Sequence, residues 1–290
     1  MKNKIRSSIN LCEVCLENKY ERTPYKIKYA DTPIPKKPLD ILHIDIFLAS
    51  PNIFLTAVDK LSRFAMLIPI TSRSIPDVKN GIIKLLSTFG NPKLFVCDNE
   101  PSLKSIEVRG LLNKLQIEIY FTPSNKSEVN GIVERFHSTL NEIYLCIKQK
   151  FDDITAKQKY RLACSLYNST IHSATQLKPI EVFYGIQEGS ERPLNLQLII
   201  ENRNKVFDEV VEKLNAYQNK TIRSRNKQRE EDPCFEENES IYNKIQGIKC
   251  KNRSKFKKQV VKLNHRKTFT DYRNIKLHKS NLKRRRKKIF

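Results

Sequence analysis

Three acidic residues of this 290-residue chain, Asp45, Asp98 and Glu134, are placed so that a folded α/β domain could bring them together. Asp45 lies inside the mostly apolar run Leu39–Leu48, where a carboxylate is costly to desolvate unless it is paired, protonated or bound to a metal ion. Asp98 ends the apolar run Lys93–Cys97, and Glu134 falls in the first turn of a predicted helix. Strand ends and the first turn of a helix are where α/β domains place groups that converge on one crevice.

Three carboxylates that meet in this way suit Mg²⁺ or Mn²⁺, because both ions prefer oxygen ligands. Two such ions about 3.5–4 Å apart can activate an attacking oxygen and stabilise a leaving oxygen at phosphorus. Without cations the like charges repel, so we expect an empty site to share a proton or to be partly disordered. Taken singly, each acid also has an ordinary structural interpretation, as a core polar residue, a turn residue or a helix-start acid. The combination of all three favours the metal site.

The elements that must position these acids follow in the order βββαβαβ and then further helices, which is the order of an α/β sandwich of about 150 residues. Short apolar runs predict five strands, at Leu39–Leu48, Ile53–Val58, Phe64–Ile70, Lys93–Cys97 and Ile117–Phe121. Apolar residues that recur every three or four positions predict helices, at Ser74–Phe89, Ser102–Leu115, Gly131–Ile147, Thr155–Ile171 and Pro179–Tyr184, and a polar helix follows at Asn204–Arg229.

Composition argues against several classes of protein. Hydrophobic residues make up 39% of the chain, and apolar runs such as Ile53–Val58 argue against a wholly disordered chain. No stretch approaches the roughly 20 apolar residues of a membrane span, so we expect no membrane partner. The first ten residues lack the apolar region of a secretion signal. The seven cysteines are odd in number and mostly scattered, which predicts reduced thiols rather than a disulfide framework.

Positive charge is concentrated at the C-terminal end. The whole chain has 54 Lys and Arg against 31 Asp and Glu, a formal charge of +23, and residues 249–290 alone carry 18 Lys and Arg with one acid. Such an excess of positive charge is typical of a segment that binds polyanions. The ordinary alternative is a solvated tail. It ends in an unbroken run of six cations, predicted to contact DNA or to direct nuclear import: Lys283, Arg284, Arg285, Arg286, Lys287 and Lys288. We therefore expect the nucleus as the location, and cytoplasmic assembly is compatible with it.

The spacing of the acids and the sequences that flank them resemble those of a known family. Between Asp45 and Asp98 lie 52 residues, and between Asp98 and Glu134 lie 35. With these gaps, and with three stretches similar to the family's motifs, the chain resembles retroviral-type integrases, specifically those of the gypsy class of LTR retrotransposons. The three stretches are Ile53–Phe64, Ser127–Leu140 and Tyr167–Thr175. The resemblance is strong over residues 36–190.

The resemblance implies an RNase H-like fold, a five-stranded mixed sheet flanked by helices. It also implies that Asp45, Asp98 and Glu134 are the catalytic residues and hold two Mg²⁺ or Mn²⁺ ions. Two reactions at phosphorus would follow. Water trims the 3′ ends of the element's DNA, and the new 3′-hydroxyls then attack the target DNA. The implied partners are double-stranded DNA, from the element ends and the target, and further copies of the chain in a homo-oligomer.

The ends of the chain resemble the family less closely. Cys12 and Cys15 have the spacing of half a tetrahedral zinc site, but the family's two upstream histidines are missing, because no His precedes His43. Zinc binding and two inert thiols both stay open. Apolar residues interleave with the basic block, and residues 278–283 resemble the end of an SH3-like domain. A small, basic, SH3-like C-terminal region is therefore expected.

Four parts are predicted along the chain: residues 1–35 as a remnant of a zinc module with a linker, 36–190 as the catalytic core, 191–235 as a helical and acidic linker, and 236–290 as a basic DNA-binding region. Two alternatives to an active integrase remain. A decayed or domesticated integrase would bind DNA or chromatin without catalysis, and a nuclease of the same fold would hydrolyse DNA without joining it.

Further contacts are predicted around Glu134. Lys126, Asn130 and Arg135 could contact DNA phosphates, although helix capping and plain solvation are ordinary alternatives for them. His137, three residues after Glu134, either lies beside the site or is a hydrogen-bonded histidine of the surface or core.

Overall fold

The structure is a computed structural model of the chain. It describes residues 12–18, 26–122, 131–186, 196–229, 237–238, 240–244, 256–265, 268–271 and 276–278. The chain divides into two compact units, residues 32–218 and residues 1–31 together with 219–290. The predicted four-part division stays a prediction. No helix among the described residues is both long and apolar enough to cross a membrane.

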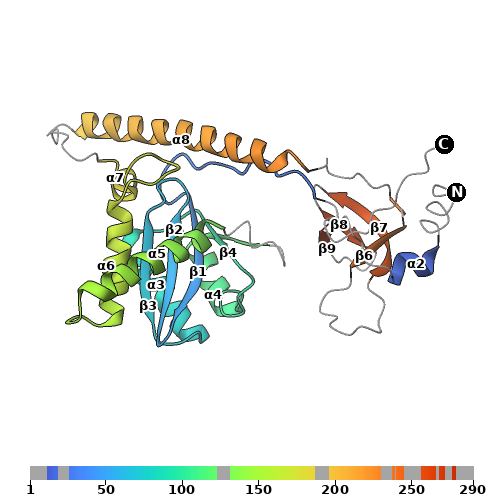
Figure 1. Cartoon of the computed structure of the whole chain (residues 1–290), viewed down its shortest axis with the longest axis horizontal. Helices are drawn as coiled ribbons and strands as arrows, with labels where there is room; N and C mark the ends of the chain where they lie inside the picture. The colour runs from blue at the N-terminus through green and yellow to red at the C-terminus, as the bar shows by residue number, and fades with distance from the viewer. Residues whose placement is uncertain are drawn as a thin grey trace. The chain divides into compact units, whose positions relative to one another are not determined.

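The first unit is built on a five-stranded mixed sheet (Figure 1) in the order β3-β2-β1-β4-β5. The strands β1 (Ile41–Ala49), β2 (Asn52–Asp59) and β3 (Ala65–Ile70) pair antiparallel as a meander. The short strands β4 (Leu94–Cys97) and β5 (Glu118–Phe121) join the other edge of β1 in parallel. This is the sheet expected from the apolar runs.

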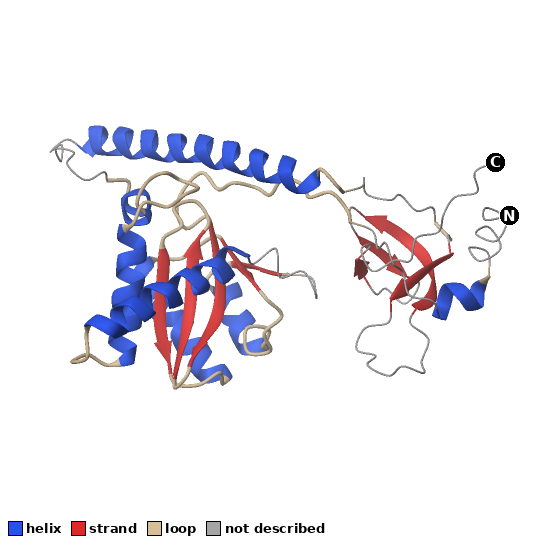
Figure 2. Ribbon diagram, viewed as in Figure 1, coloured by secondary structure: helices blue, strands red, loops and turns tan. Residues whose placement is uncertain are grey.

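Helices lie on both faces of this sheet (Figure 2). On one face are α3 (Ile75–Phe89) and α4 (Ile106–Lys114), and on the other are α5 (Gly131–Lys150) and α6 (Ala156–Ser169). The short α7 (Pro179–Tyr184) and the long α8 (Leu196–Asn226) follow. The N-terminus of α3 is capped by the Ser74 hydroxyl, which accepts the N–H of Asp77.

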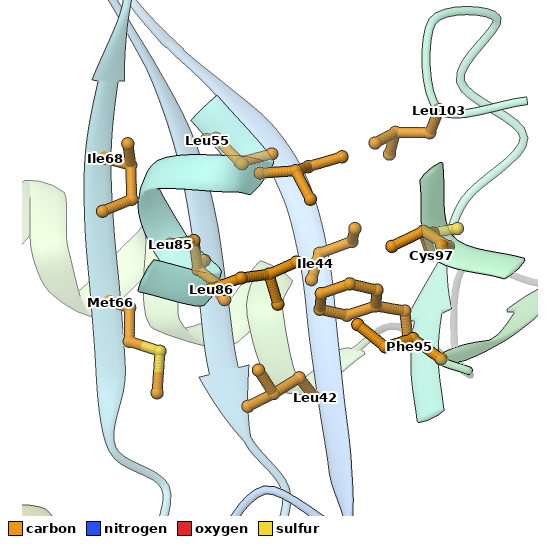
Figure 3. Close-up of a cluster of buried hydrophobic side chains, with 14 of the residues drawn as sticks. Leu42, Ile44, Leu55, Met66, Ile68, Leu85, Leu86, Phe95, Cys97 and Leu103 are labelled. Atoms are coloured by element: carbon orange, nitrogen blue, oxygen red, sulfur yellow. The ribbon is translucent and has the colours of Figure 1, made fainter. Parts of the chain in front are cut away.

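Alternation along the central strand decides which side chains face which helices. Leu42 and Ile44 of β1 point into the core under α3 and α4, part of which is drawn in Figure 3. Phe47 and Ala49 point the other way and pack with α5 and α6. Since Asp45 has the parity of Phe47, its carboxylate is on the α5 side of the sheet.

The second unit contains an antiparallel four-stranded sheet. Its strands are β6 (Ser240–Lys244), β7 (Phe256–His265), β8 (Thr268–Asp271) and β9 (Lys276–His278). The short helix α2 (Glu13–Asn18) contacts β7, where Lys258 Nζ lies 2.6 Å from Glu13 Oε1. A small β-rich region is what the interleaved apolar residues indicated, and its SH3-like character stays a prediction.

Candidate active site

Asp45 lies in the middle of β1, directly opposite Thr56 of β2. Its side chain is 27% exposed, because α5 covers this part of the sheet only partly. The backbone N–H of Ile46 donates to Asp45 Oδ1 at 2.8 Å. The other oxygen, Oδ2, accepts no hydrogen bond from a described residue, so it remains available to a ligand.

Asp98 comes one residue after β4, and β4 pairs in parallel with β1. Because Ile44 pairs with Cys97, the next position on each strand brings Asp45 and Asp98 side by side. The Thr122 hydroxyl, at the end of the neighbouring β5, donates to Asp98 Oδ1 at 2.7 Å. One oxygen of Asp98 is thereby fixed, and the other accepts from no donor in the described parts of the chain.

Glu134 is in the first turn of α5 and is exposed. Its neighbours Val133 and Phe136 are buried against the sheet and hold this turn in place. The Glu134 carboxylate makes no hydrogen bond within the described residues. The predicted helix is present as α5. Its first turn lies on the face of the sheet toward which Asp45 points.

The carboxyl of Asp45 holds its proton more tightly than an ordinary aspartate does. Burial raises the pKa of Asp45 to about 6, against the lowering effect of the Ile46 N–H. The negative charges of Asp98, Glu100 and Glu134 raise this pKa as well. Repulsion between neighbouring carboxylates favours the protonated form of one of them. Among the described residues, however, no three His, Cys, Asp or Glu side chains stand close enough to hold an ion as they are.

The donor set nevertheless fits a hard divalent cation. Each of the three acids keeps at least one carboxylate oxygen with no donor among the described residues, and oxygen ligands are those that Mg²⁺ and Mn²⁺ prefer. Glu134 is an exposed, flexible side chain on the first turn of its helix, so a change of its rotamer alone can move its carboxylate. Asp45 and Asp98 are anchored by the hydrogen bonds from Ile46 and Thr122.

A fourth acid, Glu100, contributes to the negative field but is already paired. Arg73 Nη2 lies 2.5 Å from Glu100 Oε1. Sequence reasoning missed this pair. The only available signal was the position of Glu100 two residues after Asp98 at the same strand end.

His137 lies beside the site and is also hydrogen-bonded, so both interpretations of this residue hold. Its Nε2 is 2.8 Å from Thr56 Oγ1, and its Nδ1 is 4.0 Å from Asp45 Oδ2. The Thr56 hydroxyl also lies 3.0 Å from the backbone oxygen of Asp45, to which it donates. A hydroxyl has one proton, so His137 Nε2 is then the donor to Thr56. Burial lowers the pKa of His137 to about 4, so the ring adds no positive charge at neutral pH.

Of the other predicted residues, the structure describes Arg135, Cys12 and Cys15. Arg135 is described and exposed, next to Glu134. Lys126, Asn130 and the run 283–288 lie outside the described residues. Cys12 is exposed and Cys15 half-exposed at α2, and no cluster of metal ligands involves them within the described part of the chain. Zinc binding by this pair stays a prediction.

The sequence of this chain is similar to those of known proteins. Residues 35–127 match the family described as "Integrase core domain". The chain is 34% identical over 283 residues to the retrovirus-related Pol polyprotein from transposon opus of Drosophila melanogaster, covering 98% of this chain and 28% of that polyprotein. It is 40% identical over 174 residues to the corresponding polyprotein from transposon gypsy, also of Drosophila melanogaster, covering 60% of this chain and 17% of that one.

The chain thus spans less than a third of the length of these relatives. Among solved structures, it resembles a chain of the simian T-cell lymphotropic virus intasome, determined by cryoEM in complex with PP2A regulatory subunit B56 gamma. The TM-score is 0.65 at 14% identity, over 98% of this chain and 91% of that chain, which supports the RNase H-like fold. The chain carries an integrase core domain and is of the gypsy type of retroviral integrases.

Proposed function

We propose that this chain is a metal-dependent DNA strand transferase, which trims the 3′ ends of retroelement DNA and joins them to target DNA. The observation that carries the proposal is the pairing of β1 with β4. This pairing places Asp45 beside Asp98 on the face of the sheet that α5 covers, with the charge of Glu134 acting on the same carboxylate. The relatives named above are Pol polyproteins of transposons, and this agrees with the proposal.

In this proposal Asp45, Asp98 and Glu134 hold two Mg²⁺ or Mn²⁺ ions. When bound, the ions supply the stabilisation of the attacking and leaving oxygens at phosphorus. The protein's own contribution is positioning. The Thr122 hydroxyl fixes Asp98, and the Ile46 N–H together with the Thr56 hydroxyl fixes the strand around Asp45.

The net positive charge of the chain supports DNA as its partner. A net charge of +23 attracts the polyanionic backbone of both element and target DNA. Arg135 is exposed next to Glu134 and is a direct candidate for a phosphate contact. Lys126, Asn130 and the basic run 283–288 are proposed as further contacts, and assembly into a homo-oligomer and action in the nucleus complete the proposal.

A strand-transfer assay with labelled oligonucleotides that mimic the element ends tests this function. We expect joined products with Mg²⁺ or Mn²⁺, no products above background when EDTA exceeds the metal, and recovery when metal is added back. Shortened ends without joining would instead identify a nuclease. DNA binding with neither reaction, under all metal conditions, would identify a non-catalytic binding protein and overturn the proposal.

A further inference from the structure

An ion pair joins the loop after β3 to the loop after β4, close to the acids of the candidate site. Arg73 follows β3, and its Nη2 and Nε donate to Glu100 Oε1 at 2.5 Å and 3.2 Å. Glu100 comes two residues after Asp98, and two residues span at most about 7 Å of chain. The guanidinium of Arg73 is therefore held near the acids.

The backbone on each side of this ion pair is fixed by hydrogen bonds. The Ser72 hydroxyl donates to Asp77 Oδ2 at 2.6 Å and accepts the N–H of Ser74 at 3.1 Å. Both neighbours of the arginine are thus tied to the start of α3. In the other loop, the backbone oxygen of Glu100 accepts the N–H of Lys104 at 3.1 Å. The two charged side chains consequently meet between loop segments that hydrogen bonds hold in place.

Glu100 uses only part of the hydrogen-bonding capacity of Arg73. A guanidinium has five N–H donors, and Glu100 Oε1 accepts one from Nε and one from Nη2. The other edge, formed by Nη1 and the second N–H of Nη2, donates to no residue in the described parts of the chain. The side chain of Arg73 is 48% exposed, so a ligand can reach this edge from solvent. Because the first edge is held by a carboxylate, the second edge is already oriented for an anion.

A phosphate group fits this second edge. Its N–H donors are arranged as a planar fork, which matches two oxygens of a phosphate in a bidentate contact. The hydrogen bonds and the charge of Glu100 raise the pKa of Arg73, and the charge of Asp45 raises it as well. The arginine is therefore a permanent cation beside a site that is otherwise acidic.

We propose that the free edge of Arg73 binds a backbone phosphate of DNA next to the active site, and that Glu100 is the positioning residue that orients it. This inference rests on the proposed function, since it takes DNA as the ligand. The reacting phosphate must lie at the ions that the three acids hold, so Arg73 contacts a neighbouring phosphate. That phosphate belongs either to the element end or to the target DNA, because both strands enter the site.

Single-turnover joining by the full chain in Mg²⁺ separates DNA binding from chemistry. Arg73→Met should raise the half-saturating DNA concentration about tenfold, because a charge-assisted contact is lost. The maximal rate should stay near the parent value, since a contact outside the reacting phosphate stabilises ground and transition states alike. Arg73→Lys keeps the charge without the fork and should lie in between. The matched control, Arg161→Met on the exposed side of α6, should behave as the parent.

The two DNA partners are varied separately in this assay. The element end is titrated at saturating target DNA, and the target is then titrated at saturating element end. The half-saturating concentration that rises in Arg73→Met identifies the DNA whose phosphate is bound, and a rise for either DNA supports the inference. If neither concentration rises, the inference is overturned and the proposed function is left intact.

A double variant distinguishes phosphate binding from plain neutralisation of Glu100. If Arg73 only offset the charge of that carboxylate, removing both charges in Arg73→Met with Glu100→Gln would restore the parent's half-saturating concentration, and the inference would be overturned. We expect the double variant to remain as impaired as Arg73→Met. A lower maximal rate at an unchanged half-saturating concentration would also overturn the inference, because it would place the effect on the acids. A parent protein that joins no DNA would overturn the proposed function itself.

Thermal melting shows whether each variant is folded. Surface ion pairs contribute little to stability, so we expect every variant to melt within a few degrees of the parent protein. If Arg73→Met did not fold, Arg73→Lys would decide. Parent values of both half-saturating concentrations in that variant would then contradict a bidentate phosphate contact.

Discussion

Replacing Asp45, Asp98 or Glu134 by its amide is expected to lower Mg²⁺-dependent strand transfer by a factor on the order of 10²–10³ or more. Each substitution keeps the shape of the side chain but removes a negative charge from the group that is proposed to hold the ions. The Asp45 and Asp98 variants should be affected as strongly as the Glu134 variant, because the chemistry needs all three ligands at once. The rate of joining of oligonucleotide ends, measured in single turnovers, gives the comparison.

The control for this prediction is another acid in a similar setting. Glu107 is exposed in the first turn of α4, as Glu134 is in the first turn of α5. Glu107→Gln should therefore join DNA at the parent rate. DNA affinity should stay close to the parent value in all three site variants. Full strand transfer by any one of them would show that its acid is not part of the site.

Replacing Asp59 by alanine is expected to lower the free energy of unfolding by about 3 kcal/mol or more. The substitution removes the acceptor of three donors, namely the buried N–H and hydroxyl of Ser62 and the part-buried N–H of Leu39. Burial raises the pKa of Asp59, which means that desolvation offsets part of the stabilisation these bonds provide. Urea unfolding followed by far-ultraviolet circular dichroism measures the change.

An exposed aspartate gives the matched comparison for that stability change. Asp208 lies on the exposed side of α8, so Asp208→Ala should change the unfolding free energy by no more than about 0.5 kcal/mol. If Asp59→Ala unfolded at the same urea concentration as Asp208→Ala, the hydrogen bonds of the β2–β3 turn would not be stabilising the sheet as described.

Most of the fold could be predicted from the sequence because its signals are local. Apolar runs and three-to-four periodicity identify the elements of the sheet and the helices over it. The first strand begins two residues later than the run Leu39–Leu48 suggested, since Leu39 has a φ of 66° and belongs to a turn. The long polar helix begins at Leu196 instead of Asn204, and it takes in the exposed apolar residues Leu198, Ile199 and Ile200.

The site was predictable only in part, because some of its contacts depend on strand pairing. Sequence spacing identified the acids, and the alternation of β1 explains why Asp45 faces α5. The contact of Thr56 with both Asp45 and His137 depends on the register of β1 against β2. The pair of Arg73 with Glu100 likewise joins residues that are far apart in the chain. No periodicity or motif in a single sequence encodes such contacts.

The most direct test of the metal site is a crystal structure with Mn²⁺, with the ion located by its anomalous scattering. We predict Mn²⁺ bound by carboxylate oxygens of Asp45 and Asp98 at about 2.0–2.2 Å, with Glu134 turned inward to complete the ligands. Manganese absent from these carboxylates at millimolar concentration, or bound only elsewhere in the chain, would contradict the assignment.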